Sequence, residues 1–262
     1  MSDSVMDISD RIYISTIADD CTETIMRYGT GIEICEFCTA ANMDSPHFEH
    51  WDAEVRTRLE KTDRRIFHAP FSEIYPSAID PLAVELAHIR LKQAAELAMT
   101  YNIRRMVVHG GHVPTVYYPI WFHERSVLFW KRFLDGLPDD FQIVVENVLE
   151  DIPERLLKVV SEVGDPRMAI CLDIGHANAS TEVPVCEWIN CLGRSISHVH
   201  IHNNDGHSDL HMPLGDGNID MDAAISRILE LSPQATFTIE SRPAGPSMEW
   251  LANHGYIGEV KK

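Results

Sequence analysis

Several features are missing from this chain of 262 residues. No apolar run approaches the roughly 20 residues that a membrane span requires, and residues 1–7 lack the basic and apolar segments of a secretion signal. Fixed-period repeats, low-complexity tracts and linker-like segments are also absent. We therefore expect a single domain over residues 1–262, located in the cytoplasm, with no membrane partner.

Basic residues are scarce. The chain has 22 Lys and Arg against 40 Asp and Glu, a formal net charge of −18. Proteins that bind nucleic acid draw most of their affinity from Lys and Arg on phosphates. We therefore do not expect nucleic acid as a partner, although clustered divalent ions would reverse the charge locally.

Disulfide-type cysteine spacing is missing as well. The six cysteines form no small-domain disulfide framework, and a chain of this length does not need one. Cys35 and Cys38 make a single CxxC with no second pair at zinc-ribbon spacing. We interpret both as core thiols inside a strand.

The chain does contain a regular alternation of strand and helix patterns. Strands are predicted at residues 11–18, 31–37, 64–68, 104–109, 141–147, 168–173, 198–202 and 235–240. Helices are predicted near 21–29, 47–61, 79–101 and 121–136, then one with Pro153 in its first turn, and further ones near 184–193, 221–231 and 246–254, with Asp220 as an N-cap. Continuously apolar strands indicate a parallel sheet buried on both faces. Eight such units predict an α/β fold, a single (βα)8 TIM barrel.

Potential metal ligands end six consecutive predicted strands. In a barrel the chemistry sits at the carboxyl ends of the strands. The candidates are His68, His109, Glu146, Asp173 with His176, His200 or His202 with Asp209 and His211, and Glu240. His198, His200 and His202 share one parity, so all three point to one face of their strand. Unpaired buried charge is costly, so this ring predicts a site for divalent metal ions, zinc or manganese.

These segments carry a resemblance to a known family. The motifs are His68-Ala-Pro, Val108-His109-Gly-Gly, Val145-Glu146-Asn147, Leu172-Asp173-Ile-Gly-His176, His198-Val-His200, Asp209-Leu-His211-Met-Pro-Leu-Gly-Asp-Gly-Asn-Ile and Ile239-Glu240. Together, over residues 11–255, they resemble the xylose isomerase-like TIM-barrel superfamily. That superfamily includes sugar-phosphate isomerases and epimerases and the endonuclease IV enzymes (AP endonuclease family 2).

The resemblance implies a ligand set for each branch. The strand-seven ligand of the family falls at His200, and another residue is usual at the position of His202. The single-metal set of the isomerases corresponds to Glu146, Asp173, His200 and Glu240. The trinuclear zinc set of endonuclease IV corresponds to His68, His109, Glu146, Asp173, His176, His200, Asp209, His211 and Glu240. One to three ions per chain are therefore expected.

Two kinds of chemistry stay open, beside the alternative of a metal-binding barrel that has lost catalysis. The first is isomerisation or epimerisation of a sugar or sugar phosphate, with Glu146 and Glu240 as catalytic residues for proton transfer beside a carbonyl. His202, Phe71 and Trp121 would then bind this small-molecule substrate. The acidic composition favours this reading, although the arginine that follows the strand-seven ligand in the tagatose-epimerase branch is missing.

The second kind of chemistry is phosphodiester hydrolysis by a metal cluster that uses all nine ligands. Its substrate would be an abasic site in DNA or a small phosphoester. No Arg or Lys occurs from residue 195 to 225. A loop that binds DNA normally carries cations that contact the phosphates, so this absence argues against a DNA substrate. The sequence therefore places isomerisation first. It leaves open the substrate, the native metal, and whether the chain forms a homo-oligomer.

Overall fold

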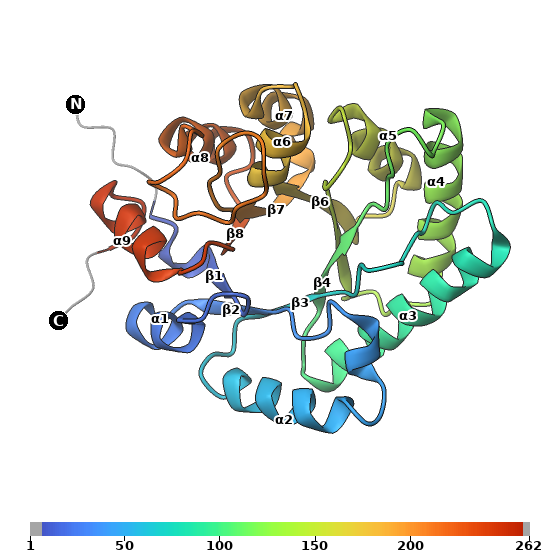
Figure 1. Cartoon of the computed structure of the whole chain (residues 1–262), viewed down its shortest axis with the longest axis horizontal. Helices are drawn as coiled ribbons and strands as arrows, with labels where there is room; N and C mark the ends of the chain where they lie inside the picture. The colour runs from blue at the N-terminus through green and yellow to red at the C-terminus, as the bar shows by residue number, and fades with distance from the viewer. Residues whose placement is uncertain (1–6, 259–262) are drawn as a thin grey trace.

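Eight parallel strands form a closed barrel in the computed structural model, which describes residues 7–258. The strands are β1 Ile12–Ser15, β2 Gly31–Ile34, β3 Arg65–His68, β4 Arg105–His109, β5 Gln142–Glu146, β6 Met168–Asp173, β7 Ile196–Ile201 and β8 Thr236–Ile239. They follow one another around the ring in chain order, and β8 pairs with β1. Figure 1 looks along the barrel and shows this ring. The predicted (βα)8 barrel is confirmed.

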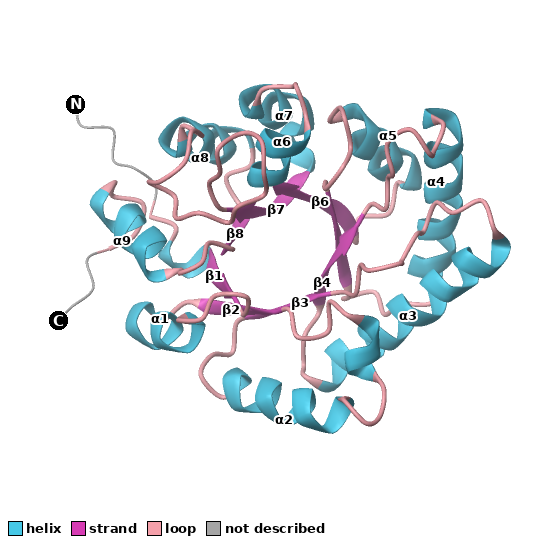
Figure 2. Cartoon of the chain, in the orientation of Figure 1, coloured by secondary structure: helices cyan, strands magenta, loops and turns pink. Residues whose placement is uncertain are grey.

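Helices surround the ring of strands (Figure 2). They are α1 Cys21–Tyr28, α2 Phe48–Leu59, α3 Pro81–Thr100, α4 Pro119–Asp135, α5 Glu154–Val163, α6 Ile174–Ser180, α7 Val185–Leu192, α8 Met221–Leu231 and α9 Gly245–Asn253. The sequence analysis missed α6, a short helix that contains glycine and asparagine and whose first turn is capped by the Asp173 side chain. The predicted N-cap at Asp220 is confirmed, because its carboxylate accepts from Ala223 N at 3.0 Å.

The first two strands are shorter than predicted. Instead of running to residues 18 and 37, β1 ends at Ser15 and β2 at Ile34. Beyond them, Cys35 N donates to Thr16 Oγ1 at 2.9 Å, and Cys38 N donates to Cys35 O at 3.1 Å. These loop bonds replace the strand ladder. The prediction of Cys35 and Cys38 as core thiols inside a strand is therefore wrong: both lie in the loop after β2 and are partly exposed.

A small apolar layer inside the barrel sets the position of the site. It consists of Ile66, Val107, Val144 and Cys171, one residue from each of four neighbouring strands. Side chains alternate along a strand, so the residue two places further on also points inward. Those residues are His68, His109, Glu146 and Asp173. The potential ligands therefore form the next level of the barrel interior, at the carboxyl ends of the strands.

Some predictions concern residues outside the described range, 7–258. Residues 1–6, on which most of the expectation about a secretion signal depends, lie outside the described residues, as do residues 259–262. The single domain over residues 1–262 stays a prediction. Among the described helices, none combines the length and hydropathy needed to cross a bilayer.

Candidate metal centre

Glu146, the last residue of β5, lies at the middle of the site and is 1% exposed. Its Oε2 lies 3.2 Å from His68 Nε2 and 3.3 Å from His109 Nε2. Its Oε1 lies 3.3 Å from His176 Nδ1 and 3.2 Å from His200 Nδ1. Each carboxylate oxygen therefore faces its own pair of imidazoles.

Asp173 and His176 continue the site from the end of β6 into α6. The Asp173 carboxylate accepts from His176 N at 2.7 Å, which fixes the first turn of α6. The same carboxylate lies 3.4 Å from His176 Nδ1. Asp173 is completely buried, so the fold holds a charged group next to Glu146 without access to water.

The loop after β7 adds Asp209 and His211. Asp209 Oδ2 lies 3.3 Å from His176 Nε2 and 3.1 Å from His211 Nε2. His211 forms a ligand-like group with His202 and Glu240. The structure thus brings all nine predicted ligands into one connected cluster.

Three of these histidines are held in the way that metal-ligating histidines usually are. The Nδ1 of each faces a backbone carbonyl: Ala69 O for His68 at 3.0 Å, Asn147 O for His176 at 3.0 Å, and Glu240 O for His211 at 2.9 Å. Each Nε2 then faces a carboxylate of the site. This orientation, together with the nitrogen and oxygen donors, fits zinc or manganese.

His202 lies in this ligand cluster as well. Its ring is completely buried, with Nε2 at 3.2 Å from Asp173 Oδ1. A Cβ on Gly175 would come within 2.0 Å of the His202 ring, so only glycine fits there. The sequence analysis gave His202 a role in substrate binding, and the structure adds a place among the potential metal ligands.

Glu146 and Glu240 differ in acidity although both are buried, at 1% and 5% exposed. Burial opposes ionisation of Glu146, but the neighbouring His200 and His109 lower its pKa well below the ordinary value. At Glu240, burial and the nearby carboxylates raise the pKa. The two residues predicted to move protons therefore differ, with Glu240 the more readily protonated.

Two further residues of the site escaped the sequence analysis. Glu33 of β2 is completely buried and forms a ligand-like group with His68, His200 and Glu240. The sequence feature that could have revealed Glu33 is a single carboxylate in the short apolar run of residues 31–34. Cys38 was treated as a core thiol, but its Sγ lies 3.3 Å from His68 Nδ1.

The predicted substrate-binding aromatics separate into two cases. The ring of Phe71 stacks on His109, with centroids 4.3 Å apart and an interplanar angle of 7°, so it borders the metal ligands. Trp121 makes an edge contact with Tyr118 and is 43% exposed. No contact among the described residues brings Trp121 to the site, and its role remains a prediction.

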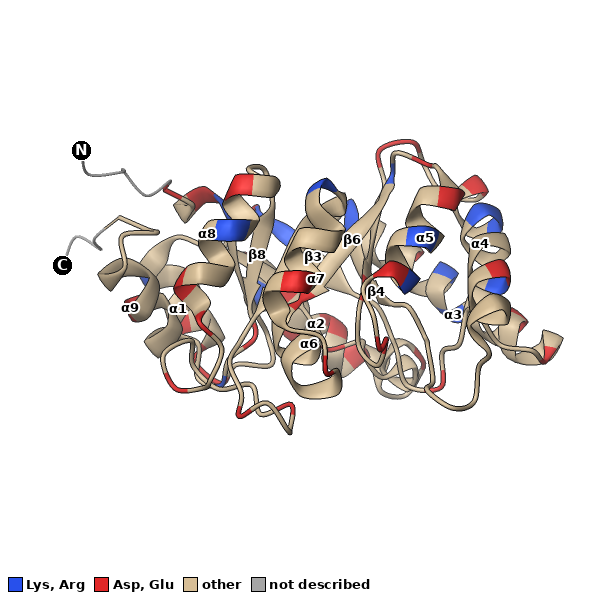
Figure 3. Ribbon diagram, turned by 90° about the horizontal axis from the view of Figure 1, so that it is seen from above, with Lys and Arg blue, Asp and Glu red and all other residues tan. Residues whose placement is uncertain are grey.

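Charge is distributed unevenly between the two ends of the barrel. The loops that follow β1 to β8 carry the site, and within the described chain their only Lys or Arg is Arg242. Arginines instead lie at or just before the starts of several strands, as with Arg65, Arg105 and Arg167. In Figure 3 the loops along the lower edge are almost free of blue. The site therefore opens onto an acidic face.

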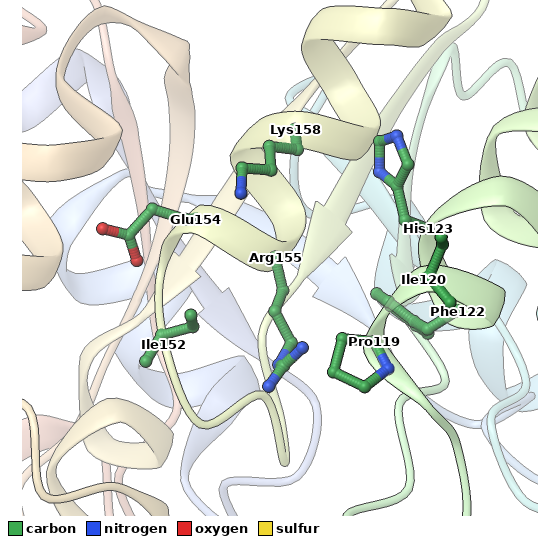
Figure 4. Close-up of a pocket in the computed structure, with 8 residues that line it drawn as sticks. All are labelled: Pro119, Ile120, Phe122, His123, Ile152, Glu154, Arg155 and Lys158. Atoms are coloured by element: carbon green, nitrogen blue, oxygen red, sulfur yellow. The ribbon is translucent and has the colours of Figure 1, made fainter.

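A cavity of about 390 Å³ lies between the first turns of α4 and α5 (Figure 4). It is lined by Pro119, Ile120, Phe122, His123, Ile152, Glu154, Arg155 and Lys158. Arg155 is paired with Asp151, and His123 with Glu162 at 2.7 Å. None of the predicted site residues lines this cavity.

Comparison with known sequences gives relatives of two kinds. An uncharacterised protein of Methanocaldococcus jannaschii, MJ1311, is 28% identical over 219 residues, which cover 78% of this chain and 73% of that protein. A probable endonuclease 4 of Mycobacterium ulcerans is 27% identical over 173 residues, which cover 62% of this chain and 67% of that protein.

Solved structures agree on the fold. A D-tagatose 3-epimerase-like protein matches with a TM-score of 0.72 and 24% identity, covering 91% of this chain and 93% of its own. The TTHB071 protein of Thermus thermophilus, soaked with zinc chloride, matches with a TM-score of 0.73 and 22% identity, covering 95% of this chain and 99% of its own. At this identity the likeness supports the fold alone.

The family follows from the sequence match. Residues 28–254 match the family described as xylose isomerase-like TIM barrel, which is most of the chain. This agrees with the closed ring of eight parallel strands and with the ligand cluster at their carboxyl ends. The chain belongs to the xylose isomerase-like TIM-barrel family.

Proposed function

We propose that the chain is a divalent-metal-dependent enzyme that hydrolyses a phosphoester bond in a small molecule. The observation that carries this proposal is the position of Glu146, whose two oxygens each lie 3.2 to 3.3 Å from a separate pair of histidine nitrogens. Glu146 belongs to two ligand-like groups, so together with these residues it would hold more than one divalent ion. Centres of two or more ions are typical of phosphoester hydrolysis.

The remaining donors fit a centre of more than one ion. Three ligand-like groups lie at the rim: His68 with His109 and Glu146, Glu146 with Asp173 and His176, and His202 with His211 and Glu240. When bound, divalent ions supply Lewis-acid activation of water and of the phosphoryl oxygen. Their charge also offsets the buried carboxylates, which have no Lys or Arg beside them among the described contacts.

The side chains of the site have different roles in such a reaction. Glu146 and Asp173 hold their positions in the buried cluster, while Asp209, with a side chain 36% exposed, lies where the cluster meets solvent. Among the described residues, Glu240 has a single imidazole nitrogen within 4.0 Å of its carboxylate, His200 Nδ1 at 3.5 Å. It is therefore the carboxylate most available to move a proton to or from a bound substrate.

The acidic face favours a small substrate. A long polyanion would meet loops whose only Lys or Arg, among the described residues, is Arg242, and repulsion from those loops would weaken its binding. A single phosphate group would need only the local positive charge of bound ions. The acidic loops therefore favour a small phosphoester over DNA as the substrate.

Isomerisation or epimerisation of a sugar or sugar phosphate is the second candidate. It is favoured by the closeness of Glu146 and Glu240, whose Oε1 atoms lie 3.2 and 3.5 Å from the same atom, His200 Nδ1. Two carboxylates at one point of the rim could exchange protons with a carbon between them. It ranks second because both oxygens of Glu146 are already enclosed by imidazoles.

The test combines metal analysis with two activity assays. Protein purified without chelator is analysed for metal content, then assayed with bis(p-nitrophenyl) phosphate and p-nitrophenyl phosphate and, separately, with a panel of ketohexoses and their phosphates. We expect two or three zinc or manganese ions per chain and ester hydrolysis. One ion per chain, with epimerisation and no hydrolysis, would establish the second candidate instead.

A further inference from the structure

Arg105, the first residue of β4, places a charged side chain inside the amino end of the barrel. It has the same parity as Val107 of the inner apolar layer, so both side chains point inward. Its Nη1 donates to Thr236 Oγ1 at 2.8 Å, on β8, which lies across the ring from β4. The guanidinium therefore crosses the barrel at the end opposite the metal centre.

The hydrogen-bond partners of this guanidinium are neutral groups. Its Nε and Nη2 donate to Gln142 Oε1 at 3.1 and 2.9 Å, and its Nη1 donates to Thr236. These bonds leave one N–H of each terminal nitrogen without an acceptor among the described residues. Burial lowers the pKa of Arg105, and the acidic groups of the interior offset this effect only in part. The charge of Arg105 thus lacks a full counter-charge.

Other arginines at this end of the barrel do have a carboxylate partner. Arg65, Arg104 and Arg167, at or just before the starts of β3, β4 and β6, lie 3.6, 3.2 and 2.6 Å from an aspartate oxygen. Within residues 7–258, no carboxylate forms such a pair with Arg105 or with Arg194, which precedes β7. A buried charge without a partner is costly, so an anion at Arg105 would stabilise the fold.

Arg105 and Arg194 line the same hollow, which has a volume of about 540 Å³. Arg194 contributes from an exposed position at its edge. Among the described residues that line the hollow, Glu230 is the only carboxylate, and it is already paired with Arg227. The hollow therefore offers two guanidinium groups to a ligand in a protein whose overall charge is strongly negative.

The rest of the wall indicates what else the ligand contains. Ile196, Leu231 and Pro233 contribute apolar surface. The volume of the hollow is in the range of pockets for small organic molecules, and it exceeds what an inorganic anion needs. Two guanidinium groups match the charge of a phosphate monoester, about −2, better than the single charge of a carboxylate.

We propose that this hollow binds a small organic phosphate, with Arg105 and Arg194 holding the phosphate group and the apolar wall contacting its organic part. A guanidinium bonds two oxygens of one phosphate in parallel, and Arg105 has an unused N–H on each terminal nitrogen for this purpose. Because the hollow and the metal centre lie at opposite ends of the barrel, this inference does not depend on which reaction the metal centre catalyses.

The test measures binding of phenylphosphonate to the metal-loaded protein by titration calorimetry. This probe has an apolar ring and a P–C bond in place of the ester. We expect the dissociation constant at one site to rise about tenfold or more in Arg105→Gln and in Arg194→Gln, because each loses charge-assisted hydrogen bonds. The control is Arg104→Gln, at the neighbouring arginine that pairs with Asp140, and it is expected to bind like wild type.

Comparison between the variants separates this hollow from the metal centre. Phosphonate bound to metal ions at the other end would contribute equally in all four proteins. Absence of binding to wild type, or equal affinities in all four, would overturn the proposal whatever the metal centre does. Benzoate is expected to bind more weakly than phenylphosphonate, and tighter binding of benzoate would overturn the assignment of a phosphate. Should Arg105→Gln not fold, Arg194→Gln, at its exposed position, decides.

Discussion

Glu150, in the loop after β5, makes the stability of the protein depend on pH in an unusual direction. The side chain is 1% exposed, and its Oε2 accepts from Val148 N at 2.7 Å. Its Oε1 has no partner among the described residues. Burial raises the pKa of Glu150 to about 7, from an ordinary value of 4.5. The folded protein therefore binds a proton at Glu150 more tightly than the unfolded chain does.

The sign follows from proton linkage. Between the two pKa values the folded state holds more protons at Glu150 than the unfolded state, so stability falls as pH rises through this window. A shift from 4.5 to about 7 corresponds to about 3 kcal/mol in total, at roughly 1.4 kcal/mol per unit. Most of that, about 2 to 3 kcal/mol, is lost between pH 5 and pH 8.

Glu150→Gln removes this titration while keeping the shape of the side chain. The amide carries a constant cost from its own buried polar atoms, and this cost cancels when one variant is compared at two pH values. We expect the variant to gain about 2 to 3 kcal/mol relative to wild type between pH 5 and pH 8. The measurement is urea unfolding of both proteins at several pH values.

A control fixes the interpretation of that experiment. Glu182→Gln makes the same chemical change at an exposed glutamate, and its stability profile is expected to run parallel to wild type. Parallel profiles for Glu150→Gln and wild type would refute the reasoning, because they would mean that Glu150 is ionised in the folded protein throughout this range.

Three other predictions concern the site. Glu240→Gln is expected to keep the circular dichroism spectrum of wild type and to lose more than nine-tenths of the activity. The reason is that a carboxylate at the rim serves chemistry and not packing. A variant that keeps more than a tenth of the wild-type activity would contradict this. His109→Ala is expected to lower the metal content per chain. The control His207→Ala, at an exposed position of the loop after β7, is expected to leave it unchanged. Equal metal contents in the two variants would show that His109 is not a ligand. Binding to an abasic duplex at physiological salt is expected to be weak, because Arg242 is the only Lys or Arg of the described loops around the site. Tight, salt-sensitive binding followed by cleavage would instead support endonuclease activity.

Much of the fold and the ligand ring could be predicted because both follow from local patterns. Apolar runs of four to six residues marked the strands, and the residue that ends each run was the one at the barrel rim. His68, His109 and Glu146 were found in this way, each two residues beyond an apolar residue of the inner layer. Because side chains alternate along a strand, each of these ligands points to the barrel interior like the apolar residue two places before it.

The strand pattern alone could not decide between His200 and His202, and it was the resemblance to the family that placed the ligand at His200. They share one face of β7 and differ only in depth, which depends on how the neighbouring strands are staggered. The pairing of β6 with β7 shifts between Ile170 and Cys171, so that Asp173 lies beside His200. A register shift of this kind has no signature in the residues themselves. Both histidines consequently belong to the buried cluster, at different levels.

Glu33 shows a different limit. Its run, residues 31–34, was recognised as a strand, and a single carboxylate in so short a strand carried no spacing that pointed to a partner. The partners of Glu33 are His198 and His200 of β7 and Thr238 of β8, more than 160 residues away in the chain. Only barrel closure brings them together. A polar layer here costs more than the apolar residues that fill the level of Val107 and Val144. Part of that cost is visible in Glu33 Oε1 and His200 Nε2, which both lack a hydrogen-bond partner among the described residues.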